Sequence, residues 1–177
     1  IFGGPRGDVQ ILPSQGDAIG AIIADGVSAI VDVSGLRTGA EQRRFVRDLL
    51  RRLRGKPDGN FHLIVDEADE YAPQKPRDDY GFEAGEELIW MVKRGRLPGF
   101  VVTIITQRPA SIDKDVLSQA QTLFAHALPA PGDQKPVIDY LKNNADAETL
   151  KTIRSSLAGL AKGERWIYSP RLGILER

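Results

Sequence analysis

Apolar residues along the chain fall into short runs that alternate with helical repeats. Strands are predicted for 28–36, 61–66 and 100–106, each rich in β-branched residues. In 100–106 the apolar residues are almost continuous, which is typical of a strand buried on both faces of a parallel sheet. Between these strands, 41–55 and 82–95 carry apolar residues at helical spacing and end at a glycine. Strands that alternate with helices predict an α/β fold with a mostly parallel sheet.

The second half of the chain continues this alternation. It predicts a short helix over 114–120, a strand over 122–128, two helices within 133–157 and two closing strands over 164–170 and 171–177. Residues before 28 are assigned no helix or strand. Because no repeat, low-complexity tract or linker interrupts the sequence, we expect a single domain spanning 1–177.

Composition narrows the class of protein. A hydrophobic content of 41% and a charged content of 27% are ordinary for a soluble globular domain of 177 residues. No apolar run approaches a membrane span and no signal-peptide pattern is present, so we expect no membrane contact and a cytoplasmic location. The absence of cysteine excludes disulfides and thiolate metal sites. A formal net charge of zero gives no bulk signal for nucleic acid.

Acidic residues gather where the strand over 61–66 ends. Asp66, Glu67, Asp69 and Glu70 follow a run of mostly apolar residues. Ligands of parallel α/β sheets bind at the carboxyl ends of the strands, so these carboxylates fall where a ligand would lie. Phosphoryl transfer needs an acid to hold hydrated Mg²⁺ and a second carboxylate to polarise the attacking water. Asp66 suits the first role and Glu67 the second; a solvated loop is the alternative.

A second strand end carries polar residues of the same kind. Thr106 and Gln107 follow the strand over 100–106, and Arg108 comes next. The Gln107 amide could hydrogen-bond the attacking water or a γ-phosphate, and an ordinary strand-ending turn is the alternative. Arg94 and Arg96 flank Gly95 at a predicted helix end, where arginine could reach phosphate oxygens. Capping of the helix end by basic residues is the alternative, and it is the favoured interpretation for Lys93.

Taken in order, these signals resemble one family, the HerA-like branch of the HerA/FtsK superfamily of hexameric DNA-translocating ATPases. The resemblance is carried by HLIVDEADEYAP, by KRGRLPGFVVTIITQRPASIDKDVLSQAQTLF, by the closing LAGLAKGERWIYSP and by the opening IFGGPRGDVQI. It implies a RecA-like P-loop NTPase core with an additional strand and a catalytic glutamate, using ATP and Mg²⁺.

The resemblance also assigns roles to single residues. By position, Asp66 matches the metal-associated acid, Glu67 the catalytic glutamate and Gln107 the sensor. Arg96 matches the finger arginine that acts across a subunit interface, with Arg94 as second choice. The nucleotide-contacting candidates are Asp66, Thr106 and Arg108.

The same resemblance implies a ring, expected to be a hexamer, that pulls duplex DNA through its pore, often beside a nuclease. One feature of the family is missing from the sequence, because no G-x-x-x-x-G-K-[ST] phosphate loop occurs in it. We expect that loop upstream of Ile1, with the chain alone inactive as an ATPase.

Other interpretations stay open. A non-catalytic HerA-like scaffold or docking module would explain the missing phosphate loop. The string DEAD at 66–69 suggests a DEAD-box RNA helicase, but TQRPAS stands where that family has Ser-Ala-Thr. A stripe of arginines along the helix over 41–55 could be a solvated face, a subunit contact or a DNA contact; it consists of Arg44, Arg47, Arg51 and Arg54.

Overall fold

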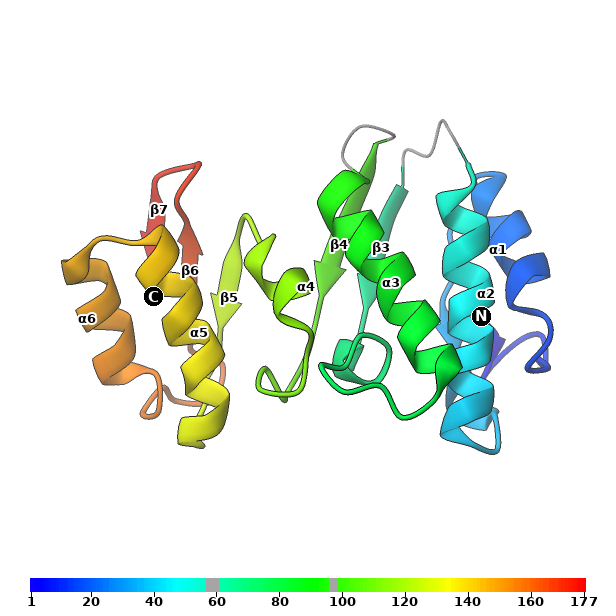
Figure 1. The fold of residues 1–177 in the computed structure, drawn as a ribbon, viewed down its shortest axis with the longest axis horizontal. Helices are drawn as coiled ribbons and strands as arrows, with labels where there is room; N and C mark the ends of the chain where they lie inside the picture. Colours follow the sequence, from blue (N-terminus) through cyan, green and yellow to red (C-terminus); the bar gives the residue numbers. More distant parts are fainter. Residues whose placement is uncertain (57–60, 96–98) are drawn as a thin grey trace. The chain divides into compact units, whose positions relative to one another are not determined.

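The computed structural model describes residues 1–56, 61–95 and 99–177. Contacts between residues divide the chain into two compact units, Ile1–Thr106 and Gln107–Arg177, called here the N-terminal and C-terminal units. Each unit contains helices and strands (Figure 1). The prediction of one domain over 1–177 stays a prediction, and each unit is described by itself.

In its described residues the N-terminal unit holds two pairs of parallel strands and three α-helices. In one pair β1 lies beside β2, and in the other Phe61 to Val65 of β3 lie in register with Phe100 to Ile104 of β4. The elements are β1 (Phe2–Gly3), α1 (Gly16–Ala24), β2 (Val31–Asp32), a 3-10 turn (Val33–Gly35), α2 (Gly39–Arg54), β3 (Phe61–Val65), a second 3-10 turn (Ala68–Glu70), α3 (Asp79–Arg94) and β4 (Phe100–Ile104).

The C-terminal unit packs three helices with three short strands. Its strands pair antiparallel in the order β5–β6–β7, so the parallel arrangement predicted for the sheet applies to the strands of the N-terminal unit. Leu141, Ile153 and Leu157 are fully buried in its core. The elements are α4 (Lys114–Ser118), β5 (Leu123–Ala125), α5 (Pro131–Asn144), α6 (Ala147–Ser156), β6 (Trp166–Ser169) and β7 (Ile174–Glu176).

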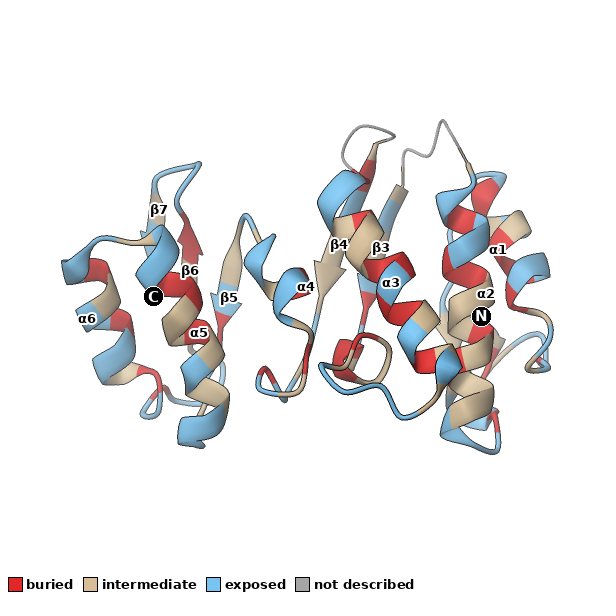
Figure 2. Ribbon diagram, in the orientation of Figure 1, coloured by how far each residue is buried: buried red, intermediate tan, exposed pale blue. Residues whose placement is uncertain are grey.

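The predicted helices α2 and α3 are confirmed, and local signals explain where each begins. Thr38 caps α2 and pairs reciprocally with Glu41 in a capping box, while Asp78 caps α3 by accepting from the Gly81 amide. Buried positions recur along both helices in Figure 2. Phe45 of α2 and Leu88 of α3 are fully buried, as the helical spacing predicts.

The strand predicted over 28–36 is mostly wrong. Only Val31–Asp32 forms a strand, because the Asp32 carboxylate accepts a hydrogen bond from the Ser34 amide and turns the chain into a 3-10 helix. The sequence prediction also missed α1. Its glycines weaken the helical signal, yet Gly16 allows close packing, since a Cβ there would lie 2.1 Å from the backbone oxygen of Phe45 in α2.

The arginine stripe of α2 has a role that the sequence interpretations did not include. Arg47 binds Glu83 of α3 at 2.6 Å. Arg51 and Arg54 both bind Glu87 of α3, at 3.3 and 2.9 Å. These arginines therefore tie α2 to α3 within the chain, and the solvated-face, subunit and DNA interpretations stay predictions.

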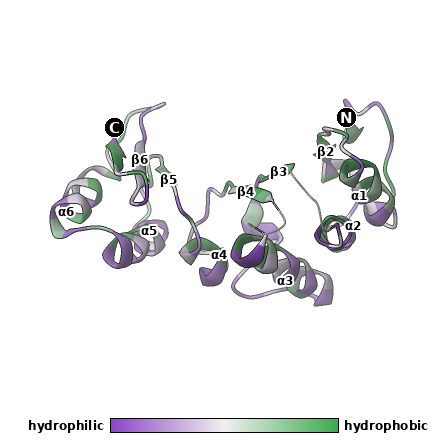
Figure 3. Cartoon of the chain, turned by 90° about the horizontal axis from the view of Figure 1, so that it is seen from above, coloured by the Kyte–Doolittle hydropathy of each residue, from purple (hydrophilic) through white to green (hydrophobic). Residues whose placement is uncertain are grey.

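The β3–β4 pair is buried on one face only. Phe100 and Val65 are buried, whereas Ile64 and Val101, on the opposite face, are 59% and 57% exposed. The expectation that the strand over 100–106 is buried on both faces is therefore wrong in this chain. Apolar residues colour these strands green in Figure 3. Alternate residues of a strand point to opposite faces, so the exposed residues share one face.

Candidate active site

The turn that follows β3 places Asp66 and Glu67 at the carboxyl end of a parallel strand. Glu67 adopts a left-handed backbone conformation with φ 49°, and among the described residues no other non-glycine has a positive φ. The Asp66 carboxylate accepts a hydrogen bond from the Glu67 amide at 3.0 Å. Asp66 is exposed and Glu67 is half-buried. Both lie between β3 and the second 3-10 turn, at the strand end where the sequence analysis expected them.

The four neighbouring carboxylates do not converge on one point. Asp69 is only 6% exposed and accepts a hydrogen bond from the Thr106 hydroxyl at 2.7 Å. Glu70 lies 4.0 Å from the Arg43 guanidinium of α2. Asp69 and Glu70 are thus bound to Thr106 and Arg43 respectively.

Arg43 is a buried cation beside this turn that the sequence analysis did not single out. It is 8% exposed and binds Asp78, the capping residue of α3, through Nε at 3.1 Å and through a second nitrogen at 2.5 Å. The hydrogen bond from Arg43 holds the pKa of Asp78 below its usual range. Arg43 therefore links α2, the acidic turn and the start of α3.

Tyr71 follows the acidic turn and stays neutral near pH 7. Burial raises the pKa of its phenol, and the negative charge of Glu70 raises it further. The phenol therefore adds no charge to a site where Asp66 and Glu67 already supply negative charge.

The remaining predicted residues lie on other segments. Arg94 is the last residue of α3 and is exposed, a position that also suits the capping interpretation. Arg96 lies outside the described residues. Gln107 and Arg108 are exposed at the start of the C-terminal unit, whereas Thr106 closes the N-terminal unit. The structure thus joins Thr106 to the acidic turn through Asp69.

The described residues could hold Mg²⁺ only if phosphate and water supplied most of its ligands. In the described ranges 1–56, 61–95 and 99–177, no group of three or more His, Asp or Glu side chains could hold a metal ion. Mg²⁺ at nucleotide sites takes one or two carboxylates and completes its shell with phosphates and water. One exposed carboxylate at a strand end, that of Asp66, meets this requirement.

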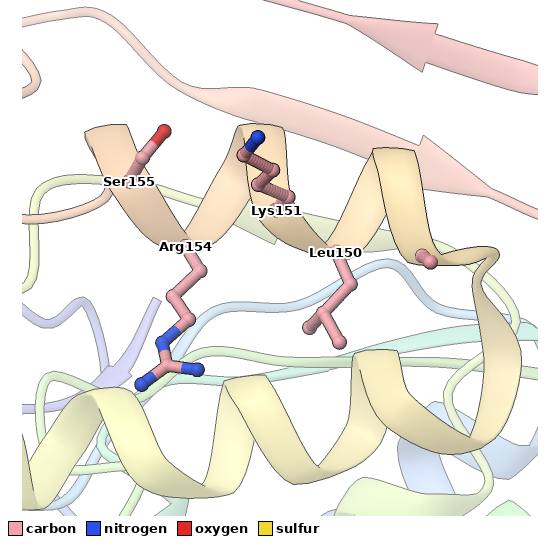
Figure 4. Close-up of a pocket in the computed structure, with 5 residues that line it drawn as sticks. Leu150, Lys151, Arg154 and Ser155 are labelled. Atoms are coloured by element: carbon pink, nitrogen blue, oxygen red, sulfur yellow. The ribbon is translucent and has the colours of Figure 1, made fainter.

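A shallow concavity runs along α6 in the C-terminal unit. Figure 4 shows Leu150 and Arg154 extending toward α5, with Lys151 and Ser155 on the other side of the helix. None of these residues was predicted as functional, and the concavity is lined by one helix alone. It therefore adds nothing to the candidate active site.

Sequence comparison gives a curated relative of this chain. The DNA double-strand break repair helicase HerA of Pyrococcus furiosus is 31% identical over 112 residues, which is 63% of this chain. The predicted resemblance to HerA is confirmed. The chain spans 19% of the length of that HerA protein. No family model matches the sequence.

Solved structures agree with the α/β fold of the chain. The genome packaging NTPase B204 of Sulfolobus turreted icosahedral virus 2, in complex with sulfate, superposes with a TM-score of 0.53 and 16% identity. That match covers 83% of this chain and 63% of B204. The AMPPCP complex of B204 gives a TM-score of 0.50 and 19% identity over 75% of this chain and 58% of B204. At this identity the likeness shows the fold alone.

The helices of the described segments give no sign of a membrane span. None of them combines the length and the apolar character that crossing a bilayer requires.

Proposed function

We propose that the intact protein carrying this chain is an ATP-hydrolysing motor that translocates DNA. The observation that carries the proposal is the fixed turn after β3, in which Glu67 directly follows Asp66 at the carboxyl end of a parallel strand. Similarity to the HerA helicase over 112 residues supports the same class of activity. An acid–glutamate pair at such a strand end supplies two of the groups that ATP hydrolysis requires, an acid for the metal ion and a carboxylate for the attacking water.

Each candidate residue has a role in this proposal. Asp66 would hold Mg²⁺, and the ion would supply charge neutralisation to the phosphates of ATP. Glu67 accepts a proton from the attacking water and orients it. Gln107 senses the γ-phosphate and Arg108 contacts the nucleotide, whereas the hydroxyl of Thr106, a nucleotide-contacting candidate from the sequence, donates to Asp69.

The arginine that neutralises transition-state charge is Arg96 or, as second choice, Arg94, supplied across a subunit interface. This role requires a ring, and we propose a hexamer that acts on duplex DNA, with a nuclease as a further partner. We propose the cytoplasm as the compartment in which the motor works.

The test is Glu67→Gln in the intact protein. We expect ATP binding to persist and turnover to fall at least about 100-fold, because the amide cannot accept the proton of the attacking water. Binding is measured by titration with a fluorescent ATP analogue, and turnover by phosphate release with and without duplex DNA.

The matched control is Glu86→Gln, an exposed glutamate on α3, which should leave turnover unchanged. Turnover that survives Glu67→Gln would mean that the acidic turn is not catalytic. Intact wild-type protein that binds ATP without hydrolysing it would favour the non-catalytic scaffold instead.

A further inference from the structure

Hydrogen bonds between β3 and β4 continue beyond the ends of both strands. The Ile105 amide donates to the Val65 carbonyl at 2.9 Å, and the Ala68 amide donates to the Ile105 carbonyl at 3.0 Å. The Thr106 hydroxyl then donates to the Asp69 carboxylate at 2.7 Å. The turn after β3 is thus held against the end of β4 by backbone and side-chain bonds in succession.

The last of these bonds involves a buried carboxylate. Asp69 is 6% exposed, and its neighbours Ala68 and Ala72 are 0% and 1% exposed. A carboxylate removed from water is unfavourable unless it is hydrogen-bonded. The Thr106 hydroxyl supplies such a partner at 2.7 Å, an ordinary length for an O–H···O hydrogen bond. Asp69 therefore serves the turn itself and does not point to a ligand.

The bond is placed where it can hold Glu67. A glutamate at φ 49° is in a conformation that L-residues avoid, and such strain persists only when surrounding contacts fix the backbone. The residues that follow Glu67, namely Ala68 and Asp69, are the ones bound to β4. Releasing Asp69 from Thr106 would therefore let the backbone of Glu67 relax.

We propose that Asp69 and Thr106 are positioning residues that fix the carboxylate of Glu67 for ATP hydrolysis. Their hydrogen bond ties the turn that carries Glu67 to the end of β4, from which the chain continues directly into Gln107. This inference rests on the proposed function, because it assigns the pair to the reaction that Glu67 performs.

The test compares Thr106→Val and Thr106→Ser in the intact protein. Valine keeps the shape of threonine and removes the donor, whereas serine keeps the hydroxyl. We expect Thr106→Val to lower kcat by about 10-fold to 100-fold with KM for ATP within about 2-fold, since a misplaced catalytic group slows the chemical step. Thr106→Ser should recover most of kcat.

The matched control is Thr103→Val, which removes a hydroxyl from the same strand. The Thr103 hydroxyl pairs with His62 at 2.8 Å and is not bound to the acidic turn. Wild-type kcat in Thr106→Val would overturn the inference. An equal loss in Thr103→Val would also overturn it, because loss of any β4 hydroxyl would then suffice.

A second readout separates this inference from the proposed function. Hydrogen exchange of the Ala68 amide reports on the turn and does not require ATP turnover. We expect faster exchange of Ala68 in Thr106→Val than in the wild type and in Thr103→Val. If the wild type has no ATPase activity, the proposed function fails, and unchanged exchange of Ala68 would show separately that the Thr106–Asp69 bond does not hold the turn.

Discussion

Glu67 occupies a backbone conformation that suits glycine better than any other residue. A residue with a side chain costs about 1–2 kcal/mol in the left-handed region, because its Cβ approaches the following carbonyl oxygen. Glycine avoids that clash but loses more chain entropy on folding. A glutamate that keeps φ 49° is therefore retained for its side chain at the expense of local stability.

The comparison of Glu67→Gly with Glu67→Ala isolates this backbone strain, because both variants lack the carboxylate. We expect Glu67→Gly to be more stable than Glu67→Ala by about 1 kcal/mol, since the left-handed penalty exceeds the entropy cost of glycine. The measurement is the free energy of unfolding in urea for the 177-residue chain.

The same pair of substitutions at Glu86 provides the control. Glu86 is an exposed residue within the helix α3, where glycine should be less stable than alanine by about 1 kcal/mol. Glycine should therefore be more stable than alanine at position 67 and less stable than alanine at position 86. A variant Glu67→Gly that is less stable than Glu67→Ala would show that the turn is not left-handed in solution.

At the scale of elements, the contact between α2 and α3 is unusually polar for helices that bury apolar residues. Glu87 is 6% exposed and binds two arginines, whose side chains are 53% exposed for Arg51 and 39% exposed for Arg54. The Arg54 guanidinium also lies over the Trp90 ring at 4.5 Å. Water can therefore reach the two arginines of this contact, whereas the Glu87 carboxylate is buried.

This difference predicts an asymmetry between mutations on the two helices. Glu87→Gln leaves two cations that water can solvate, whereas the double variant Arg51→Gln/Arg54→Gln leaves a buried carboxylate without its cations. We expect the double variant to be less stable than Glu87→Gln by about 1–3 kcal/mol. Urea unfolding of the 177-residue chain measures both.

The control is Arg52→Gln, an exposed arginine of the same helix, which should change stability by less than about 0.5 kcal/mol. Equal losses from Glu87→Gln and from the double arginine variant would mean that Glu87 is solvated in the folded chain.

The sequence predicted these helices well and their contacts poorly. The spacing of Phe45, Leu49 and Leu53 fixes the buried face of α2, because a helix repeats every 3.6 residues whatever it packs against. The partners of its arginines depend on where α3 lies, and sequence spacing within α2 contains no information on that. Glu87 could have drawn attention as a carboxylate on the apolar side of α3, since Ala84 and Met91, three residues before it and four after it, are 0% and 1% exposed.

The sequence likewise predicted the residues of the candidate site and not the contacts that hold them. Asp66 and Glu67 were found because an apolar strand that ends in acids is a local signal. The hydrogen bond between Asp69 and Thr106 joins residues 37 positions apart, so only the register of β3 and β4 reveals it. The sequence assigned no separate role to Asp69 and Glu70, and the structure shows that they bind Thr106 and Arg43.

At the scale of the whole molecule, the chain leaves one face of a two-stranded parallel sheet uncovered. Ile64, Val101 and Ile105 are 59%, 57% and 44% exposed on or directly after β3 and β4. Parallel strands are ordinarily covered on both faces, and apolar patches on a monomer tend to bind other surfaces. The apolar residues that predicted burial of this strand on both faces therefore form exposed apolar surface in the isolated chain.

We expect the isolated 177-residue chain to bind a hydrophobic dye such as ANS at this face. The variant Ile64→Thr/Val101→Thr should lower dye fluorescence by about half or more while the circular dichroism spectrum is kept, because threonine suits a strand and removes apolar surface.

Leu172→Thr is the control, since Leu172 is 71% exposed in the turn between β6 and β7 and away from both strands in sequence. Dye fluorescence that is insensitive to the double variant would mean that the face is covered in solution. A wild-type chain whose mass by light scattering is twice that of the double variant would identify a second copy as the cover.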